Sequence, residues 1–477
     1  MRVLSVASEC VPLIKTGGLA DVVGALPGVL AAQGVEMRVM LPAYAGILDK
    51  LEGPLEEVWA DWNLYSAHAR LLKGRLDGLT VLALDAPHLY HRDGGPYADT
   101  NGDYWDNPER FAALCWAAAA VAREGMGDGW KPDILHAHDW QAGLAPAYLR
   151  YFGDGGVKSV ITIHNIAFQG VTGGNRLEDL HLPWHAWHPD HAEYHGNIST
   201  LKAGLSQADA ITTVSPTYAE ELMRPEFGMG LEGVIAARAD DLHGILNGVE
   251  AGTWAPETDT AITPYSADTL KEKTKNRDAL RAEFGLDDIP GPLAIVVSRL
   301  TWQKGIDLLI EALPAFIEAG GGLALLGSGE RHLEQAVQDA ARRWPGRVGV
   351  KIGYDEDLSH RMFGGGDAVI VPSRFEPCGL TQMYGLKYGT VPVVAATGGL
   401  NDTVIGATPA SLSANAATGI SFHPVDTIAL SGALRQLIAL YGDRAGWTRL
   451  VKRAMKAEVG WEGPAKAYAD LYRSLTA

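Results

Sequence analysis

The chain has 477 residues, of which 47% are hydrophobic and 20% are charged, and its formal net charge is −17. This length exceeds what one ordinary hydrophobic core holds, so at least two domains are expected. The negative charge argues against nucleic acid and against an anionic membrane surface as the main partner. The three cysteines are far apart and make no disulfide framework, which fits a reducing cytoplasm.

Nothing in the sequence predicts a membrane segment or a secretion signal. No apolar run approaches the roughly 18 residues that a membrane helix needs. Glu9 and Lys15 interrupt the apolar stretch that a signal core would require. We therefore expect a soluble cytoplasmic protein.

Short apolar runs recur along both halves of the chain. The first half contains RVLSVAS, MRVMLPAY, TVLALDAP, DILHAHDW, SVITIHN and AITTVS, and the second contains LAIVVSRL, LALLGSG, VGVKIGY, AVIVPS and VPVVAAT. Runs this apolar, alternating with helical patterns such as residues 111–123, are typical of parallel strands whose sheet is covered on both faces. The sequence therefore predicts an α/β protein with two doubly wound, Rossmann-like domains.

We place the domain boundary after LHGILNGVE. The N-terminal domain then covers residues 1–248 and the C-terminal domain residues 249–458. The second domain begins with a polar segment rich in Pro and Thr, residues 251–268, and a charged helix over 269–284; residues 459–477 form an amphipathic terminal helix. Ligands of such sheets bind at the carboxyl ends of strands. We therefore expect the site in the cleft between the two domains.

The first strand is followed by KTGGLADVVGALPGVL, residues 15–30. Lys15 and the adjacent Gly17 and Gly18 precede an apolar helical pattern, where backbone amides at a helix N-terminus can hold an anion. The pattern is neither GxxxxGK[ST] nor GxGxxG. The alternative is a plain tight turn with a solvated lysine.

A second pair of cations stands in SRLTWQKG. Arg299 and Lys304 follow a strand and lie in the turn that begins a helix. Arginine gives a forked contact and lysine a point charge, which suits a diphosphate. The alternative is two solvated basic side chains. Together with Lys15, the two cations make a stronger case than either feature alone.

The segment PSRFEPCGLTQMYG places a carboxylate after another strand. Glu376 can accept hydrogen bonds from sugar hydroxyls, and Gly379 opens a helix whose amides can face a phosphate. The alternative for Glu376 is a charge at a helix N-terminus worth a few tenths of a kcal/mol. Cys378 is expected to be a small packed residue and not a nucleophile.

Two further strands end in HAHDW and HNIAFQG. His136 and His138, with Asp139, resemble a metal-ligand pair, but we expect these two strand residues to face opposite sides of the sheet, so that their imidazoles do not converge. His164 and Asn165 stand where they could hydrogen-bond a reacting sugar. The alternative for a lone histidine is a structural role.

Two other patterns resemble a dinucleotide fingerprint and a metal site, and both interpretations are disfavoured. GMGLEG, residues 228–233, matches GxGxxG but follows a helical stretch and not a strand, so it predicts a loop. HLPWHAWHPDHAEYHG contains five histidines, but two prolines break any continuous helix through it. A histidine-rich surface loop is favoured there over a metal site.

The motifs taken together resemble one family. KTGGLADV, HAHDW, HNIAFQG, VSPTYA, NGV, SRLTWQKG and PSRFEPCGLTQMYGLKYG follow in that order over nearly the whole chain. In this the chain is similar to the bacterial glycogen synthases and plant starch synthases. The resemblance implies the glycosyltransferase B fold, with a terminal helix returning to the first domain. It also implies transfer of glucose from ADP-glucose to the nonreducing end of an α-1,4-glucan, with retention and with neither a metal nor a cofactor.

The resemblance also implies roles for individual residues. Those implied to act on the transferred glucose and the departing ADP are His164, Glu376, Arg299 and Lys304. Those implied to bind substrate are Lys15 and Gly18 at the pyrophosphate, Asp21 beside them, Asp139 on the acceptor side, Asn165, Asn247, Tyr354 beside adenine, and Cys378, Gly379, Leu380 and Thr381 in the loop whose amides face donor oxygens.

One position departs from the wider superfamily, in which many retaining members carry two glutamates with seven residues between them. The second position here is Tyr384, a difference that the glycogen synthases share. The resemblance therefore implies a front-face mechanism in which the leaving phosphate accepts the proton of the acceptor. The alternatives are another retaining glucan transferase, a glucan phosphorylase, or a non-catalytic glucan-binding protein.

Overall fold

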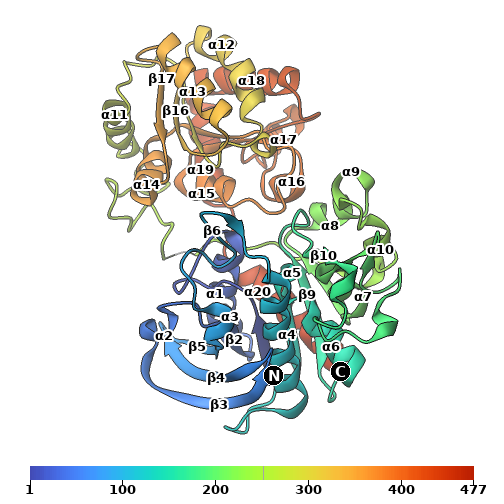
Figure 1. Ribbon diagram of the computed structural model, residues 1–477. Coiled ribbons are helices and arrows are strands. Elements are labelled where there is room, and N and C mark those ends of the chain that lie inside the picture. Colours follow the sequence, from blue (N-terminus) through green and yellow to red (C-terminus); the bar gives the residue numbers. More distant parts are fainter. Residues whose placement is uncertain (251) are drawn as a thin grey trace. The chain divides into compact units, whose positions relative to one another are not determined.

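A computed structural model describes every residue of the chain except residue 251. The chain forms two compact units (Figure 1). Unit 1 comprises residues 1–247 and 462–477, and unit 2 comprises residues 248–461. The observed boundaries lie after residues 247 and 461, whereas the sequence predicted boundaries after residues 248 and 458.

Unit 1 is built on a nine-stranded sheet in the order β14-β13-β9-β8-β1-β2-β5-β4-β3. Seven neighbouring strands run parallel, and the apolar runs expected to form strands in this half do so. These strands are β1 (Arg2–Val6), β2 (Glu36–Pro42), β5 (Leu79–Asp85), β8 (Ile134–His138), β9 (Lys158–Ile163), β13 (Ala210–Thr213) and β14 (Leu242–Gly244).

The last two strands of this sheet, β3 (Glu52–Leu64) and β4 (Ala67–Leu76), are antiparallel and were not expected from the sequence. They form the long curved ribbon drawn in blue below β5 (Figure 1). The two-residue turn between them places Tyr65 and Ser66 at φ values of 49° and 75°. A two-residue hairpin turn with positive φ values normally contains Asn or Gly. Because neither residue occurs here, the sequence did not predict a hairpin.

The helices of unit 1 include α1 (Gly18–Ala31), α4 (Asn107–Glu124), α6 (Leu144–Phe152) and α7 (Thr200–Gln207). The alanines of α4 are buried, because small side chains let this helix pack closely among its neighbours. The terminal helix α20 (Glu462–Thr476), drawn in red, lies against α1 (Figure 1). Its Tyr472 hydroxyl reaches His136 Nδ1 at 2.8 Å, so the end of the chain is part of unit 1.

Unit 2 is built on a six-stranded, fully parallel sheet in the order β17-β16-β15-β18-β19-β20. The strands are β15 (Leu293–Val297), β16 (Gly322–Gly327), β17 (Val348–Ile352), β18 (Ala368–Val371), β19 (Val391–Ala395) and β20 (Ile420–Phe422). The longer helices are α12 (Ile306–Glu318), α13 (Arg331–Arg343), α14 (Glu356–Gly365), α18 (Thr427–Gly442) and α19 (Arg444–Met455). Apolar side chains from the strands and from α12, α13, α18 and α19 form its core.

The polar segment at the start of unit 2 is packed onto the domain. Residue 251, where the expected segment begins, lies outside the described residues. Trp254 is 9% exposed, and its ring stacks on the ring of His360 with 4.0 Å between centroids. Asp259 Oδ2 lies 2.8 Å from His360 Nδ1. The charged helix α11 (Lys273–Glu283) that follows is shorter than the expected residues 269–284.

Candidate functional site

The carboxyl edge of the unit 2 sheet has one topological switch point. Strands β15, β16 and β17 extend to one side, and β18 lies on the other side of β15. In open α/β sheets, ligands bind outside the carboxyl ends of the strands at such a point. The loop after β15 carries Arg299 and Lys304, and the loop after β18 carries Glu376. Three of the predicted site residues therefore flank the switch point.

Lys304 and Glu376 form an ion pair there, between Lys304 Nζ and Glu376 Oε2. Both side chains are largely buried, at 17% and 10% exposure. Ser373 Oγ donates a second hydrogen bond to the same Oε2 atom at 3.0 Å. Glu376 Oε1 has no hydrogen-bond partner among the described residues. The carboxylate is thus fixed in place with one oxygen left to accept a hydrogen bond.

The two loops that carry this pair are joined to each other. Arg374 makes a forked ion pair with Asp307, at 2.8 and 2.6 Å, and its guanidinium lies 4.3 Å from the Trp302 ring. Gly305 adopts a φ of 66°, and a Cβ there would stand 2.0 Å from the carbonyl oxygen of Pro372. Only glycine fits this approach, so the Lys304–Glu376 pair depends on a specific close contact.

Arg299 and Tyr354 lie at the same edge of the sheet but are not joined to the pair. The Arg299 guanidinium is exposed and has no partner within the described part of the chain. Tyr354 follows β17, is 76% exposed, and donates to Glu356 Oε2 at 2.9 Å. Both side chains are therefore accessible to a ligand.

The turn after Glu376 leads into helix α15 (Thr381–Tyr388). Cys378 is buried, as expected for a packed residue, and Gly379, Leu380 and Thr381 are partly exposed. The N-cap residue of α15, Leu380, makes no side-chain hydrogen bond to the first turn, so the amides of that turn can face an anion.

Sequence reasoning missed Gln382, the residue that holds this turn. The Gln382 side chain is completely buried, and its amide nitrogen donates to the carbonyls of Cys378 at 3.0 Å and Gly379 at 2.7 Å. Gln382 lies three residues from Gly379 within one motif. A glutamine at this spacing is the signal that could have identified it.

Tyr384 is one layer of an aromatic stack. Its ring lies 3.8 Å from that of Trp254, at an interplanar angle of 11°. Trp254 in turn stacks on His360. The position therefore has a packing role in this fold.

In unit 1 the switch point lies at β1, which has β2 on one side and β8 on the other. Lys15 and Gly18 stand in the loop after β1 and in the first turn of α1. Lys15 Nζ pairs with Asp21 Oδ1 at 2.8 Å, and both side chains are partly exposed. A Cβ added at Gly17 or Gly18 would meet no atom within 4 Å, and neither residue has a left-handed φ. The fold itself therefore does not require glycine at either position.

Sequence reasoning also missed Glu9, which orders this loop. Glu9 is 3% exposed and accepts hydrogen bonds from the backbone amides of Thr16 and Gly17 and from the Tyr97 hydroxyl. A buried carboxylate bonded to backbone amides holds a loop in one conformation. Its only sequence signal was a charge in an otherwise apolar segment.

Asp139, His164 and Asn165 come together after β8 and β9. Asp139 Oδ1 accepts from the backbone amide of His164 at 2.7 Å and, at 3.4 Å, from that of Asn165. Asp139 has a φ of 55°, an uncommon conformation for a residue other than glycine. Burial raises its pKa to about 7, against the two backbone hydrogen bonds that lower it. The carboxyl group therefore positions the start of the His164 loop.

The expectation that His136 and His138 face opposite sides of the sheet was wrong. Their ring centroids lie 4.2 Å apart, because residues two apart in a strand point to the same face. Among the described residues they belong to no group of three or more His, Cys, Asp or Glu side chains that could hold a metal ion. Burial instead lowers the pKa of His136 to about 3 and that of His138 well below its usual value.

The remaining expectations concern Asn247 and two discounted patterns. Asn247 is 8% exposed, and its Oδ1 atom is buried without a hydrogen bond. Residues 228–233 span the end of α9 (Pro225–Gly228) and the start of α10 (Glu232–Ala236). The element directly before them is a helix and not a strand, as the sequence predicted. The five histidines of residues 181–195 form no metal-binding group in the described chain.

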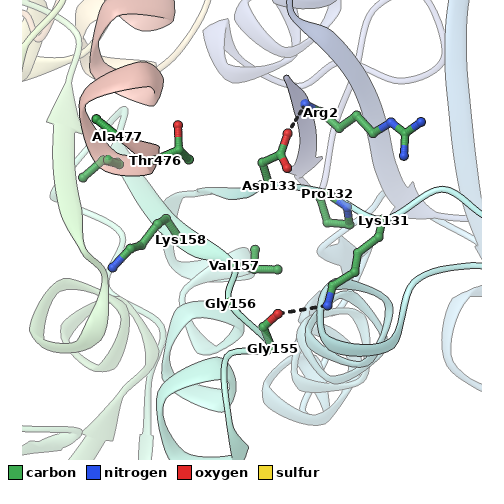
Figure 2. A pocket seen from close by; sticks show the side chains of 11 residues that line it. Arg2, Lys131, Pro132, Asp133, Gly155, Gly156, Val157, Lys158, Thr476 and Ala477 are labelled. Carbon is green, nitrogen blue, oxygen red and sulfur yellow. Dashed lines mark hydrogen bonds between the residues drawn. The ribbon is translucent and has the colours of Figure 1, made fainter.

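A cavity of about 600 Å³ lies at the opposite, amino-terminal edge of the unit 1 sheet (Figure 2). Its basic residues already have partners. Lys131 Nζ donates to the carbonyl of Gly155 at 2.9 Å, and Lys158 lies 3.4 Å from Asp209. None of the predicted site residues lines it.

No described helix is both long enough and apolar enough to span a bilayer.

Two protein-family models match the chain. Residues 2–237 match the starch synthase catalytic domain, and residues 277–453 match glycosyl transferases group 1. The chain is 62% identical over 476 residues to a glycogen synthase of Cereibacter sphaeroides, covering 100% of this chain and 99% of that protein. It is 56% identical over 478 residues to the glycogen synthase of Paracoccus denitrificans, covering 100% of each.

Two solved structures are also similar to this chain. The catalytic domain of starch synthase IV from Arabidopsis thaliana, bound to ADP and acarbose, is 30% identical with a TM-score of 0.86, and the match covers 99% of each chain. Sucrose-phosphate synthase from Thermosynechococcus elongatus is 19% identical with a TM-score of 0.59, covering 99% of this chain and 98% of that one. This second likeness concerns the fold alone.

Proposed function

Because the chain belongs to the glycogen synthase family of glycosyltransferases, we propose that it transfers glucose from ADP-glucose to the nonreducing end of an α-1,4-glucan and releases ADP. The observation that carries this proposal is the Lys304–Glu376 pair at the switch point of unit 2. Two cations, the largely buried Lys304 and the exposed Arg299, suit the negative charge of a nucleoside diphosphate, and the Glu376 carboxylate suits the hydroxyls of the attached sugar. The ADP and acarbose of the starch synthase relative support the same ligand class.

We assign the donor's diphosphate to Arg299, Lys304 and the amides at the start of α15. Arg299 supplies a forked contact, and Lys304 supplies a point charge that is already oriented by Glu376. Charge builds on the diphosphate as the glycosidic bond to ADP breaks. These groups stabilise that charge in the transition state.

We assign the transferred glucose to Glu376 and His164. Glu376 Oε1 accepts from a sugar hydroxyl while Oε2 stays bonded to Lys304 and Ser373. The His164 backbone amide is held by Asp139, which places its carbonyl for the anomeric carbon. Lys15 and Gly18 line the pyrophosphate, with Asp21 beside them as the ion-pair partner of Lys15. Asn165, Asn247 and Tyr354 remain substrate-binding proposals, with Tyr354 beside adenine.

The reaction is proposed to retain the α configuration and to need no metal. Tyr384 is packed against Trp254 and offers no second carboxylate for a double displacement. The departing phosphate then takes the proton of the acceptor hydroxyl as the new bond forms on the same face of the sugar. The cations named above already meet the charge that a metal would otherwise neutralise.

The test is proton NMR of the product formed from ADP-glucose and a maltooligosaccharide in the presence of EDTA. The expected product is a longer chain with only α-1,4 anomeric signals. A β-linked product would contradict retention, and activity that requires added Mg²⁺ or Mn²⁺ would contradict the metal-free mechanism. Glucose 1-phosphate formed from glucan and phosphate, without ADP-glucose, would indicate the phosphorylase alternative.

A further inference from the structure

Three neighbouring strands of unit 1 bring Ser5, His138 and His164 into one hydrogen-bonded row. Ser5 lies on β1, His138 ends β8, and His164 follows β9. Ser5 Oγ lies 3.1 Å from His138 Nε2, and His138 Nδ1 lies 3.0 Å from His164 Nε2. Ser5 and His138 are completely buried, whereas His164 keeps part of its surface open.

The directions of these hydrogen bonds follow from counting protons. Among the described residues, the Ser5 hydroxyl has one side-chain partner, His138 Nε2. A buried hydroxyl gives its proton to an available acceptor, so Ser5 donates and Nε2 of His138 accepts. A neutral imidazole carries one proton, which places the His138 proton on Nδ1. That N–H donates to His164 Nε2, and the proton of His164 is left on its own Nδ1.

We propose that Ser5 and His138 are positioning residues that hold His164 as the Nδ1–H tautomer, so that it presents a neutral hydrogen-bond donor at the carboxyl edge of the sheet. His164 Nδ1 has no partner elsewhere in the described chain. Its ligand is an oxygen atom of the bound sugar, an identification that rests on the proposed function. Neither Ser5 nor His138 touches the substrate.

Burial supports the neutral state of the row. It lowers the pKa of His164 to about 3, and the pKa of His138 is lowered by burial and by the neighbouring His136 and His164. An imidazole of this kind does not gain a proton near neutral pH. His164 therefore acts by donating a hydrogen bond and not as an acid.

His136 provides a matched comparison on the same strand. It is also completely buried and faces the same side of the sheet, but it bonds to Thr162 and to Tyr472. Its hydrogen bonds do not lead to His164. A loss of function that comes merely from removing a buried histidine should appear equally at both positions.

The direct test is a long-range proton–nitrogen correlation spectrum of the full chain labelled with [¹⁵N]histidine. The His164 signals are identified by their loss in His164→Gln. The expected pattern has the proton on Nδ1 in the wild type and a shift toward Nε2–H in Ser5→Ala and in His138→Phe. A wild-type Nε2–H pattern, or an unchanged tautomer in both variants, would overturn the proposal.

Kinetics test whether the tautomer matters. The Asn side chain can place an amide N–H where Nδ1–H of histidine stands, so His138→Asn should stay within about threefold of the wild-type kcat. His138→Phe should lose about five- to tenfold, the range of one neutral hydrogen bond, while His136→Phe should not show this loss. Equal losses in His138→Phe and His136→Phe would refute the positioning role. The spectrum needs no activity, so an inactive wild type would contradict only the proposed function.

Discussion

At the scale of single residues, the contacts that matter join positions far apart in the chain. Lys304 and Glu376 are separated by 72 residues, and their pairing was not predicted from the sequence. Each was identified as a candidate from its place after a strand. The sequence predicted that Lys304 binds the diphosphate and that Glu376 binds the sugar. The ion pair shows that these two side chains are in direct contact.

Glu376 should act mainly in the transition state. Glu376→Ala is expected to lower kcat by at least about a hundredfold, with a smaller change in donor KM, because its contact strengthens as charge develops on the sugar. Ser373→Ala removes one neighbouring hydrogen bond and leaves the Lys304 pair, so a loss below about tenfold is expected. Steady-state kinetics on folded variants measures both. A kcat near the wild-type value in Glu376→Ala would reduce Glu376 to a charge at a helix end.

Gly18 should be needed for the ligand and not for the fold. Gly18→Ala is expected to leave the melting temperature unchanged or slightly higher, because the added Cβ meets no atom in the folded chain. It should raise donor KM by about tenfold if a phosphate approaches this backbone, which corresponds to about 1.4 kcal/mol. Gly28→Ala, on the same helix and equally open, is the control. An unchanged KM in Gly18→Ala would remove the loop from the donor site.

At the scale of secondary-structure elements, the parallel strands of both sheets were predictable. Continuous apolar runs bounded by turns identified them, and polar residues after those runs identified the candidate site. The β3–β4 hairpin was missed because its turn residues, Tyr65 and Ser66, lack a turn signal. The contact between His136 and His138 was missed through a wrong assignment of strand faces. Glu9 and Gln382 were missed because buried loop supports leave no periodic pattern.

Strands β8 and β9 should make unit 1 sensitive to acid. His136 and His164 have folded pKa values of about 3, against about 6.5 in an unfolded chain. Their contribution to stability is complete above pH 6.5 and is lost as the pH falls toward 3, at most about 2 kcal/mol per histidine at pH 5. Asp139 acts in the opposite sense: its raised pKa stabilises the fold at low pH, and that contribution is lost as the pH rises through 7.

Thermal melting at pH 7.5 and at pH 5.0 tests this balance. The wild-type melting temperature of unit 1 should fall on acidification. His136→Asn should show a smaller fall, and Asp139→Asn a larger one. The same fall in all three proteins would contradict the account.

Helix α11 is fixed to the unit 2 core by one lysine. Lys273 Nζ lies within 3.1 Å of five acceptors, the carbonyl oxygens of Phe363, Gly364 and Tyr388 and the hydroxyl oxygens of Tyr265 and Thr390, and its N–H groups are shared among them. Lys273→Met leaves these buried acceptors without their donor, so the free energy of unfolding should fall by about 2–4 kcal/mol.

The exposed lysine two residues along the same helix is the control. Within the described residues Lys275 pairs only with the partly exposed Glu272, and Lys275→Met should cost less than about 1 kcal/mol. Urea denaturation of the two variants gives the comparison. Equal losses would show that the carbonyl cluster does not depend on Lys273.

At the scale of the whole molecule, two α/β units each present polar residues at the carboxyl edge of their own sheet. The net charge of −17 does not favour an anionic ligand. The diphosphate binding that we propose therefore depends on local cations, and the loops after β1 and β15 carry Lys15, Arg299 and Lys304. The family and the fold were predictable from motif order.

The most direct test is ADP or UDP release measured with ADP-glucose and with UDP-glucose, each with and without glycogen. The account predicts rapid ADP release from ADP-glucose that depends on glycogen, and slow release from UDP-glucose. The same assay with Glu376→Ala should show at least about a hundredfold loss. Glycogen-dependent turnover of UDP-glucose but not of ADP-glucose, or release that does not respond to glycogen, would contradict it.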